Sequence, residues 1–222
     1  MPQNRNSYCG EKMSKYVEDL IVRTPSLEAM RPSLNAAVDL IVSAFHGGNK
    51  VLTCGNGGSA ADAEHIVGEL MKGFLLQRRV SDAQEQQLLS GGCPGELIAH
   101  LQQGVPAISL VAGVSLPTAF ANDVSAKAVF AQQVFALGKK GDVLIAISTS
   151  GNSGNVIAAV HVAKALGIKC IGLTGGKKSL LADMANVCIA VPATEVVRVQ
   201  ELHLPVYHAI CADVEDSLFN TI

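Results

Sequence analysis

Five short apolar runs, separated by stretches with a helical spacing of apolar residues, constrain the fold of this chain more than any other feature. Each run is rich in Val, Ile, Leu or Cys, which indicates strands that are buried on both faces. The runs are Val51–Cys54, Ala107–Val111, Val143–Ile147, Cys170–Leu173 and Val187–Val191. Strands that alternate with helices predict one α/β domain, a five-stranded parallel sheet flanked by helices on both faces.

The helical stretches lie between and around these runs. Apolar residues recur at helical spacing in Leu27–Phe45, Ala60–Leu76, Ala128–Leu137, Val156–Leu166 and Glu195–Phe219. Residues 1–46 are expected to form an N-terminal helical arm of the same domain, broken near Pro25 and Pro32, and residues 47–222 the α/β domain proper. The arm packs either on its own chain or on a partner subunit. Pro205 predicts a kink in the last helix.

The composition fits a single folded domain and excludes several classes of ligand. The 222 residues are 49% hydrophobic and 16% charged, which is typical of an ordered globular chain. A formal net charge of −2 offers no basic stripe for nucleic acid. No apolar run reaches the ~18 residues of a membrane span, and Met1–Met13 lacks the apolar core of a secretion signal. Six cysteines without CxxC spacing favour reduced thiols, so we expect a cytoplasmic protein.

The stretch from Gln77 to Gly104 is polar and glutamine-rich, unlike its surroundings. It predicts an insertion between the helix after the first strand and the second strand. Two interpretations remain open, a solvated loop with a short helix at Glu96–Gln103 and a lid beside the functional site. The composition favours the solvated loop.

A glycine-rich turn after the first predicted strand carries the first functional signal. The segment Cys54-Gly55-Asn56-Gly57-Gly58-Ser59-Ala60 joins that strand to a helix, where free N–H groups and close backbone approach suit an anion. The turn also matches the loose dinucleotide pattern. However, the acidic residue expected ~20 residues later at the end of a second strand is missing, and no Gly-Lys-Ser/Thr follows. We therefore expect no nucleotide cofactor.

A hydroxyl-rich loop after the third predicted strand is the stronger signal. Ser148-Thr149-Ser150-Gly151-Asn152-Ser153 brings four hydroxyls to the start of a helix, enough to hold a phosphate dianion without a lysine. Ser153 alone has an ordinary explanation as a helix cap. A cap needs one hydroxyl, whereas this loop offers four.

Two helices add ionisable side chains. His65 and Glu69 are four residues apart and share one face of the helix that leaves the glycine turn; elsewhere such a pair is usually a surface contact. Gln200 and His208 lie on one face of the C-terminal helix. A lone histidine on a helix is usually structural, and Arg198 and His203 on the same helix have this ordinary explanation.

Taken together, GNGGSAADAEHIVGEL, Asn122-Asp123, STSGNS and VQELHLPVYH resemble the sugar isomerase (SIS) domain family, most closely its bacterial phosphoheptose isomerases. The similarity runs from about Leu27 to Phe219. It implies a sugar-phosphate substrate and a homotetramer with sites at subunit boundaries. The implied reaction converts sedoheptulose 7-phosphate to D-glycero-D-manno-heptose 7-phosphate through an enediol.

The resemblance also implies a role for individual residues. Glu69 falls on the general base of the family and His208 on its general acid. Some members bind Zn²⁺, at positions that match His65, Glu69, Gln200 and His208. Substrate contacts fall on Asn56, Gly57, Gly58, Ser59, Glu69, Asn122, Asp123, Ser148, Thr149, Ser150, Ser153 and Gln200.

Two departures and one related non-enzyme bear on this expectation. Gly73 and Val197 stand where the family isomerases commonly carry Arg and Asp, and Lys72 or Arg78 are candidates to substitute for the arginine. A SIS relative is a non-catalytic regulator that binds the replication initiator protein, but it lacks the glutamate and the second histidine that this chain has. A SIS transcriptional sensor would carry a helix-turn-helix domain, for which residues 1–46 are too short. We therefore expect an enzyme.

Overall fold

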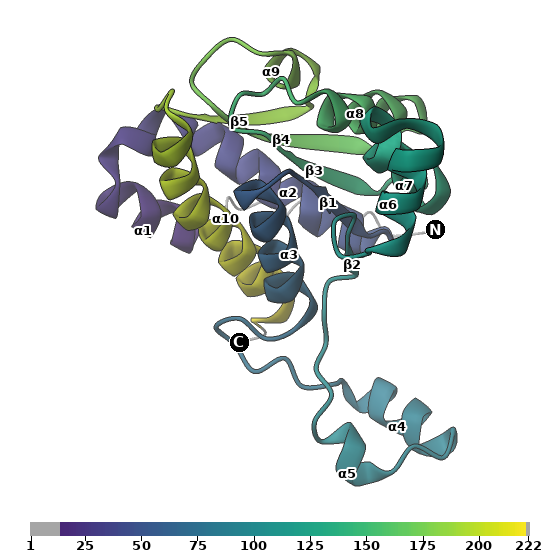
Figure 1. Cartoon of the computed structure of the whole chain (residues 1–222). Coiled ribbons are helices and arrows are strands. Elements are labelled where there is room, and N and C mark those ends of the chain that lie inside the picture. Colours follow the sequence, from purple (N-terminus) through teal and green to yellow (C-terminus); the bar gives the residue numbers. More distant parts are fainter. Residues whose placement is uncertain (1–13, 221–222) are drawn as a thin grey trace, which may run out of the picture.

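The computed structural model describes residues 14–220 and contains a parallel sheet between two layers of helices (Figure 1). The strands are β1 (Val51–Cys54), β2 (Ala107–Ser109), β3 (Val143–Ile147), β4 (Lys169–Gly175) and β5 (Val187–Val191). Their order in the sheet is β2-β1-β3-β4-β5, and every neighbouring pair is parallel. The predicted fold class is confirmed. The prediction for Met1–Met13 lies outside the described residues.

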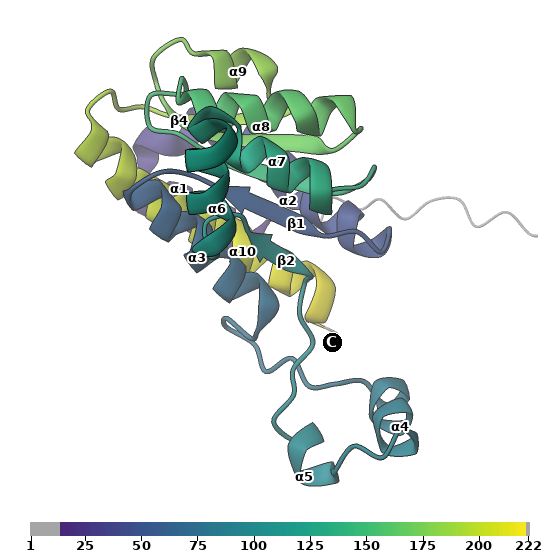
Figure 2. The ribbon, with the colours of Figure 1, turned by 45° about the vertical axis from the view of Figure 1, so that its right-hand side comes forward.

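Each face of the sheet has its own hydrophobic core. The helices α1 (Lys15–Arg23), α2 (Arg31–His46), α3 (Gly58–Met71) and α10 (Val196–Phe219) cover one face; α7 (Val129–Leu137), α8 (Gly154–Ala165) and α9 (Leu180–Met184) cover the other (Figures 1 and 2). In β3, Val143 and Ile145 join the first core, and Leu144 joins the second. This alternation explains why the strands read as continuous apolar runs.

Most differences from the predicted elements concern their ends. The bounds of β1, β3 and β5 are as predicted, whereas β2 stops at Ser109 and β4 extends to Gly175. Helix α3 ends at Met71, five residues before the predicted end at Leu76, because Lys72 has an extended backbone and the chain turns there toward α10. Helix α10 is one element although Pro205 lies inside it.

The N-terminal arm packs on its own chain. After α1, a 3₁₀ helix η1 (Pro25–Met30) leads directly into α2, and Pro32 lies in the first turn of α2, where proline is tolerated. The carboxylate of Asp213 on α10 accepts hydrogen bonds from the backbone N–H groups of Tyr16 and Val17, at 3.0 and 2.8 Å. These bonds satisfy the start of α1, which no nearer side chain caps.

The insertion forms a lobe that projects from the body (Figures 1 and 2). It contains α4 (Asp82–Ser90) and α5 (Gly95–Ile98). The interpretation as a loop with one helix at Glu96–Gln103 is wrong in part, since α4 was not predicted and the second helix is shorter. Ser81 and Gln84 close a capping box at the start of α4, and none of the residues of α4 is buried.

Between β2 and α7 lies a further set of short helical turns that the sequence did not predict. These are α6 (Ser115–Phe120), the π-helical turn η2 (Ala121–Ser125) and the 3₁₀ turn η3 (Ala126–Ala128).

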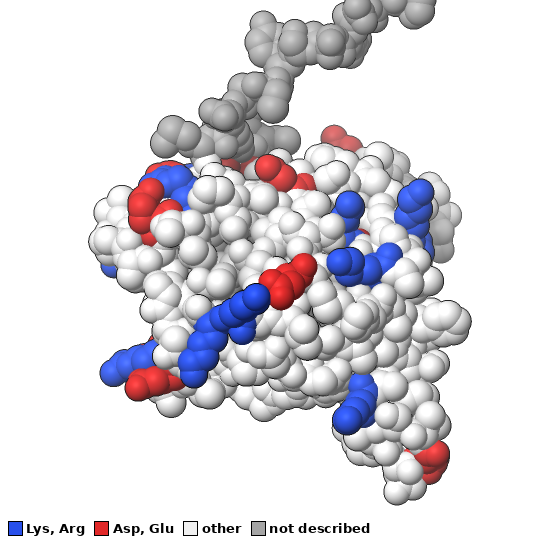
Figure 3. Space-filling model, turned by 90° about the horizontal axis from the view of Figure 1, so that it is seen from above, with Lys and Arg blue, Asp and Glu red and all other residues white. Residues whose placement is uncertain are grey.

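In the part of the chain that the structure describes, no helix is both long and apolar enough to cross a membrane. On the face seen in Figure 3, charged side chains are dispersed among uncharged ones.

Candidate active site

The two loops singled out in the sequence lie side by side at the carboxyl ends of β1 and β3, because these strands are neighbours in the sheet. Asn56 follows β1 and Asn155 lies in the first turn of α8. Their side-chain amides exchange two hydrogen bonds, each 2.9 Å long. This pair fixes the glycine turn relative to the hydroxyl loop.

The glycine turn leaves room for a side chain from α10. Gly57 has a φ of 57°, a conformation that favours glycine, and no side chain caps the start of α3. A Cβ placed on Gly58 would lie 2.5 Å from Nε2 of Gln200. Gln200 therefore approaches the start of α3 as closely as it does only because residue 58 has no side chain.

The hydroxyl loop gathers its side chains at the start of α8. Ser148 Oγ lies 2.9 Å from Ser153 Oγ and 3.4 Å from Ser150 Oγ. Ser153 occupies the capping position of α8, but its hydroxyl accepts no bond from the helix backbone. The cap explanation is therefore wrong. Hydroxyl groups clustered at a helix N-terminus can bind phosphate.

A cavity of about 260 Å³ adjoins this loop. Its wall includes Thr149, Ser150 and two exposed lysines, Lys177 and Lys178, which follow β4. These lysines were not predicted from the sequence. The signal that could have found them is their place directly after an apolar strand, at the sheet edge that carries the other two loops.

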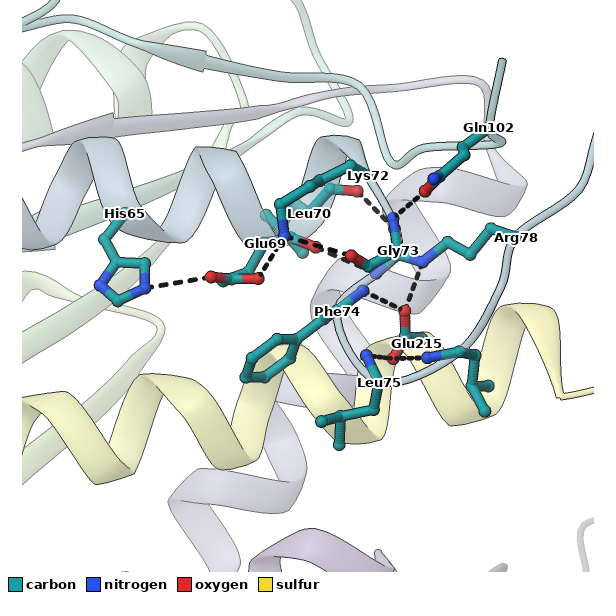
Figure 4. Close-up of polar contacts among 11 residues, drawn as sticks. His65, Glu69, Leu70, Lys72, Gly73, Phe74, Leu75, Arg78, Gln102 and Glu215 are labelled. Carbon is teal, nitrogen blue, oxygen red and sulfur yellow. Dashed lines mark hydrogen bonds and ion pairs between the residues drawn. The ribbon is translucent and has the colours of Figure 1, made fainter. Parts of the chain in front are cut away.

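The ionisable residues of α3 form a chain of contacts around Glu69 (Figure 4). His65 Nε2 lies 3.0 Å from Glu69 Oε1, and Lys72 Nζ donates to Glu69 Oε2 at 3.1 Å. On its other side, His65 Nδ1 lies 3.0 Å from the hydroxyl of Tyr207, which donates to Asp62 at 3.3 Å. Glu69 is only 9% exposed, and each oxygen of its carboxylate has one of these two partners.

His208 on α10 completes this cluster. Its ring lies edge-on to that of His65, with centroids 5.0 Å apart, and 5.4 Å from that of Phe74. Burial and the neighbouring His65 lower the pKa of His208, and Glu69 opposes this effect. A lowered pKa favours the neutral ring at pH 7. Among the described residues, no hydrogen-bond partner reaches its buried Nε2.

Of the other residues predicted from the sequence, some contact the candidate site and some do not. Lys72, not Arg78, contacts the Glu69 carboxylate, because Arg78 binds Glu215 instead. Asn122 donates to Asp123 at 2.8 Å in the π-helical turn, and both side chains are exposed. Within residues 14–220, no hydrogen bond or ion pair joins this exposed pair to the rest of the candidate site.

The four residues that the resemblance assigns to zinc do not fit a metal ion as they are arranged. Within the described residues, no three or more His, Cys, Asp or Glu side chains are placed to hold one. Both ring nitrogens of His65 contact other side chains, Glu69 and Tyr207, and Gln200 lies against Gly58. Zinc stays a prediction from the resemblance.

Comparisons with known proteins agree on one family. The model of the SIS domain family matches residues 15–86 and 95–175. The phosphoheptose isomerase of Roseiflexus sp. (strain RS-1) is 38% identical over 198 residues, which cover 89% of this chain and 88% of that protein. Two solved phosphoheptose isomerases have similar structures. That of Francisella tularensis has a TM-score of 0.73 at 31% identity and covers 95% of this chain and 100% of its own. That of Neisseria gonorrhoeae has a TM-score of 0.71 at 32% identity, with 91% and 96% covered.

Proposed function

Because the chain belongs to the SIS domain family, we propose that it is an aldose–ketose isomerase that converts sedoheptulose 7-phosphate to D-glycero-D-manno-heptose 7-phosphate. The similarity to phosphoheptose isomerases over about nine tenths of the chain supports this substrate. The observation that carries the assignment is the group formed by Glu69, His65 and His208. A buried ring nitrogen without a partner is costly, and a substrate oxygen would pair with it.

The reaction needs one base and one proton donor. As Glu69 takes the proton from the carbon next to the carbonyl, His208, as a neutral imidazole, gives its N–H proton to the carbonyl oxygen, and the enediol forms. His208 then takes the proton of the other enediol hydroxyl while Glu69 returns its proton to the neighbouring carbon, and the aldose forms. His65 and Lys72 hold the carboxylate in place through its two oxygens.

The phosphate end of the substrate binds the hydroxyl loop in this proposal. Ser148, Thr149, Ser150 and Ser153 offer hydroxyl groups, and the positive end of α8 adds a favourable dipole. Asn56, Gly57, Gly58, Ser59 and Gln200 would line the sugar between this loop and Glu69. The exposed pair Asn122 and Asp123 would contact the substrate from η2.

The assembly and the compartment are also proposals. Large apolar side chains are exposed on this chain: Leu75 (53% exposed) lines a hollow together with His208, and Val22 (77%) and Met71 (53%) are exposed on α1 and α3. Their exposure supports a homotetramer in which partner subunits cover these side chains. Light scattering coupled to gel filtration tests the tetramer. Five free cysteines among the described residues support a reducing compartment, the cytoplasm.

The test is turnover of sedoheptulose 7-phosphate beside five- and six-carbon ketose phosphates, followed by NMR in deuterated water. Wild type is expected to isomerise the seven-carbon sugar and to exchange its transferred proton. Glu69→Gln and His208→Gln are each expected to lose at least ~100-fold. The matched controls are Glu64→Gln and His161→Gln, which replace exposed residues and should keep full activity.

The competing function is a regulator that binds a phosphosugar or a protein without catalysis. Glu69 and His208, which the replication-initiator-binding relative lacks, favour the enzyme. If no sugar phosphate is converted, yet sedoheptulose 7-phosphate raises the melting temperature of the wild type, the regulator is right and the enzyme is wrong.

A further inference from the structure

A buried ion pair lies behind the candidate active site. Arg78 Nε and Glu215 Oε1 are 2.6 Å apart, and both side chains are 1% exposed. Arg78 ends the turn after α3, and Glu215 lies on α10 (Figure 4). Among the ion pairs of the described residues, no other has both side chains this deeply buried.

Glu215 fixes the turn that follows α3. Its Oε1 accepts a second bond, from the backbone N–H of Phe74 at 2.7 Å. Its Oε2 accepts from the N–H groups of Leu75 and Leu76, at 2.7 and 3.1 Å. One carboxylate thus pairs with three consecutive backbone donors and a guanidinium, which leaves the turn little freedom.

Arg78 fixes the end of α3 itself. Its Nη1 donates to the carbonyl of Leu70 at 2.7 Å and its Nη2 to the carbonyl of Glu69 at 3.0 Å. Carbonyls in the last turn of a helix have no N–H partner inside the helix. The guanidinium supplies a partner to both carbonyls, that of Leu70 being shared with the backbone N–H of Val105 at 2.9 Å, and its positive charge suits the C-terminal end of the helix dipole.

The ion pair therefore joins the two helices that carry the acid–base residues. Glu69, whose carbonyl Arg78 binds, lies on α3. Glu215 lies seven residues after His208 on α10, which places both on the same side of that helix two turns apart. We propose that Arg78 and Glu215 are positioning residues that fix the separation of Glu69 and His208. This inference rests on the proposed isomerase function.

Stability alone does not account for the pair. A buried ion pair is often no more stabilising than apolar side chains of similar volume, because both charges lose their hydration. What apolar side chains cannot supply is a directional bond to the carbonyl of Glu69. A misplacement of ~1 Å in an active site can cost about 100-fold in rate, so such a bond is valuable there.

The test compares Arg78→Lys and Glu215→Gln with a matched control at the amino end of the central strand, opposite the end that carries the candidate site. Asp142 is also a fully buried carboxylate, at the amino end of β3. It accepts from the backbone N–H groups of Lys50 and Lys139, at 3.0 and 2.8 Å, and from Lys50 Nζ at 2.6 Å. Asp142→Asn thus removes a similar buried charge without touching α3 or α10.

We expect Arg78→Lys and Glu215→Gln to lower kcat by about 100-fold while KM stays within about twofold. Asp142→Asn should lower the melting temperature and leave kcat within about twofold of the wild type. The double replacement Arg78→Met with Glu215→Leu keeps the interior filled but leaves the N–H groups of Phe74, Leu75 and Leu76 without the carboxylate, so its melting temperature should fall. Below that temperature, where circular dichroism shows it folded, it should be at least as slow as the single variants.

A double-mutant cycle separates positioning from general damage. If Arg78 acts through Glu69, adding Arg78→Lys to Glu69→Gln causes no further loss of the residual rate. Two outcomes would overturn the inference and leave the isomerase function intact. In the first, the combined variant loses the product of the two single-variant losses in rate. In the second, the single variants fold and turn over at the wild-type rate. An inactive wild type would instead overturn both.

Discussion

Replacing Gly58 by alanine should disable the site without unfolding the protein. A Cβ at this position would lie 2.5 Å from Nε2 and 3.2 Å from Cδ of Gln200, whereas ordinary contact begins at 3.4 Å. The amide must therefore withdraw by about 0.9 Å (3.4 − 2.5). Only the end of a flexible side chain has to move, and a non-ideal rotamer costs about 1 kcal/mol.

The expected effects on stability and on activity differ in size. Gly58 is the first residue of α3, and alanine is favoured over glycine in helices by up to ~1 kcal/mol, which offsets the strain. The free energy of unfolding should stay within about 1 kcal/mol of the wild-type value. Gln200 is a proposed substrate contact, and its displacement by nearly 1 Å should cost about 100-fold in kcat/KM.

Two other glycines provide the controls. A Cβ on Gly68, in the same helix, meets nothing within 4 Å, so Gly68→Ala should keep full activity. A Cβ on Gly55 would overlap the main-chain carbonyl of Ser59, so Gly55→Ala should destabilise the fold. The assays are NMR turnover and thermal unfolding. A Gly58→Ala variant with wild-type stability and turnover within twofold of the wild type would refute the proposed role of Gln200.

Three more predictions concern pH, phosphate binding and metal. Burial lowers the pKa of the fully enclosed His203, so protonation favours the unfolded chain. The free energy of unfolding should therefore fall as the pH drops below ~6.5. Urea titrations at several pH values measure this dependence, which His203→Leu should weaken. Replacing Lys177 and Lys178 together by alanine should raise KM for the sugar phosphate about tenfold and leave kcat unchanged. The control is Lys169→Ala, at the amino end of β4. An unaltered KM in the double variant would show that the two lysines do not face the phosphate. EDTA tests the zinc that the resemblance predicts. His65, Glu69, Gln200 and His208 must rearrange to hold an ion, so a loss of turnover that Zn²⁺ restores would support zinc, and turnover within about twofold of the untreated enzyme would contradict it.

The sequence was informative where one local pattern carries the structural signal. The bounds of β3 could be predicted because both faces of the strand are buried, so every residue of the run is apolar. Helix α4 was missed because none of its residues is buried, so it has no apolar face. Its local signs were weaker ones: the capping box of Ser81 with Gln84, acidic residues in the first turn and a glycine at the C-terminal end.

Contacts across the site could not be predicted in the same way. The bonds of Asn56 with Asn155 and of His65 with Tyr207 join residues about 100 or more positions apart. Which partners meet depends on the order of the strands and on the packing of α10 against α3, and no local spacing encodes either. The hydroxyl loop was found because all its groups lie within six consecutive residues. The roles of the site residues stay predictions.

The attachment of the lobe determines how insertions and deletions in this segment affect the rest of the fold. The backbone N–H of Gln103 donates to the carbonyl of Arg78 at 2.7 Å, and Arg79 pairs with Gln102 as an antiparallel bridge. The two ends of residues 79–102 are therefore adjacent in space. A short turn could close the gap at small entropic cost, and a longer insertion would start from the same two points. Length variation at this position leaves both hydrophobic cores and the sheet as they are.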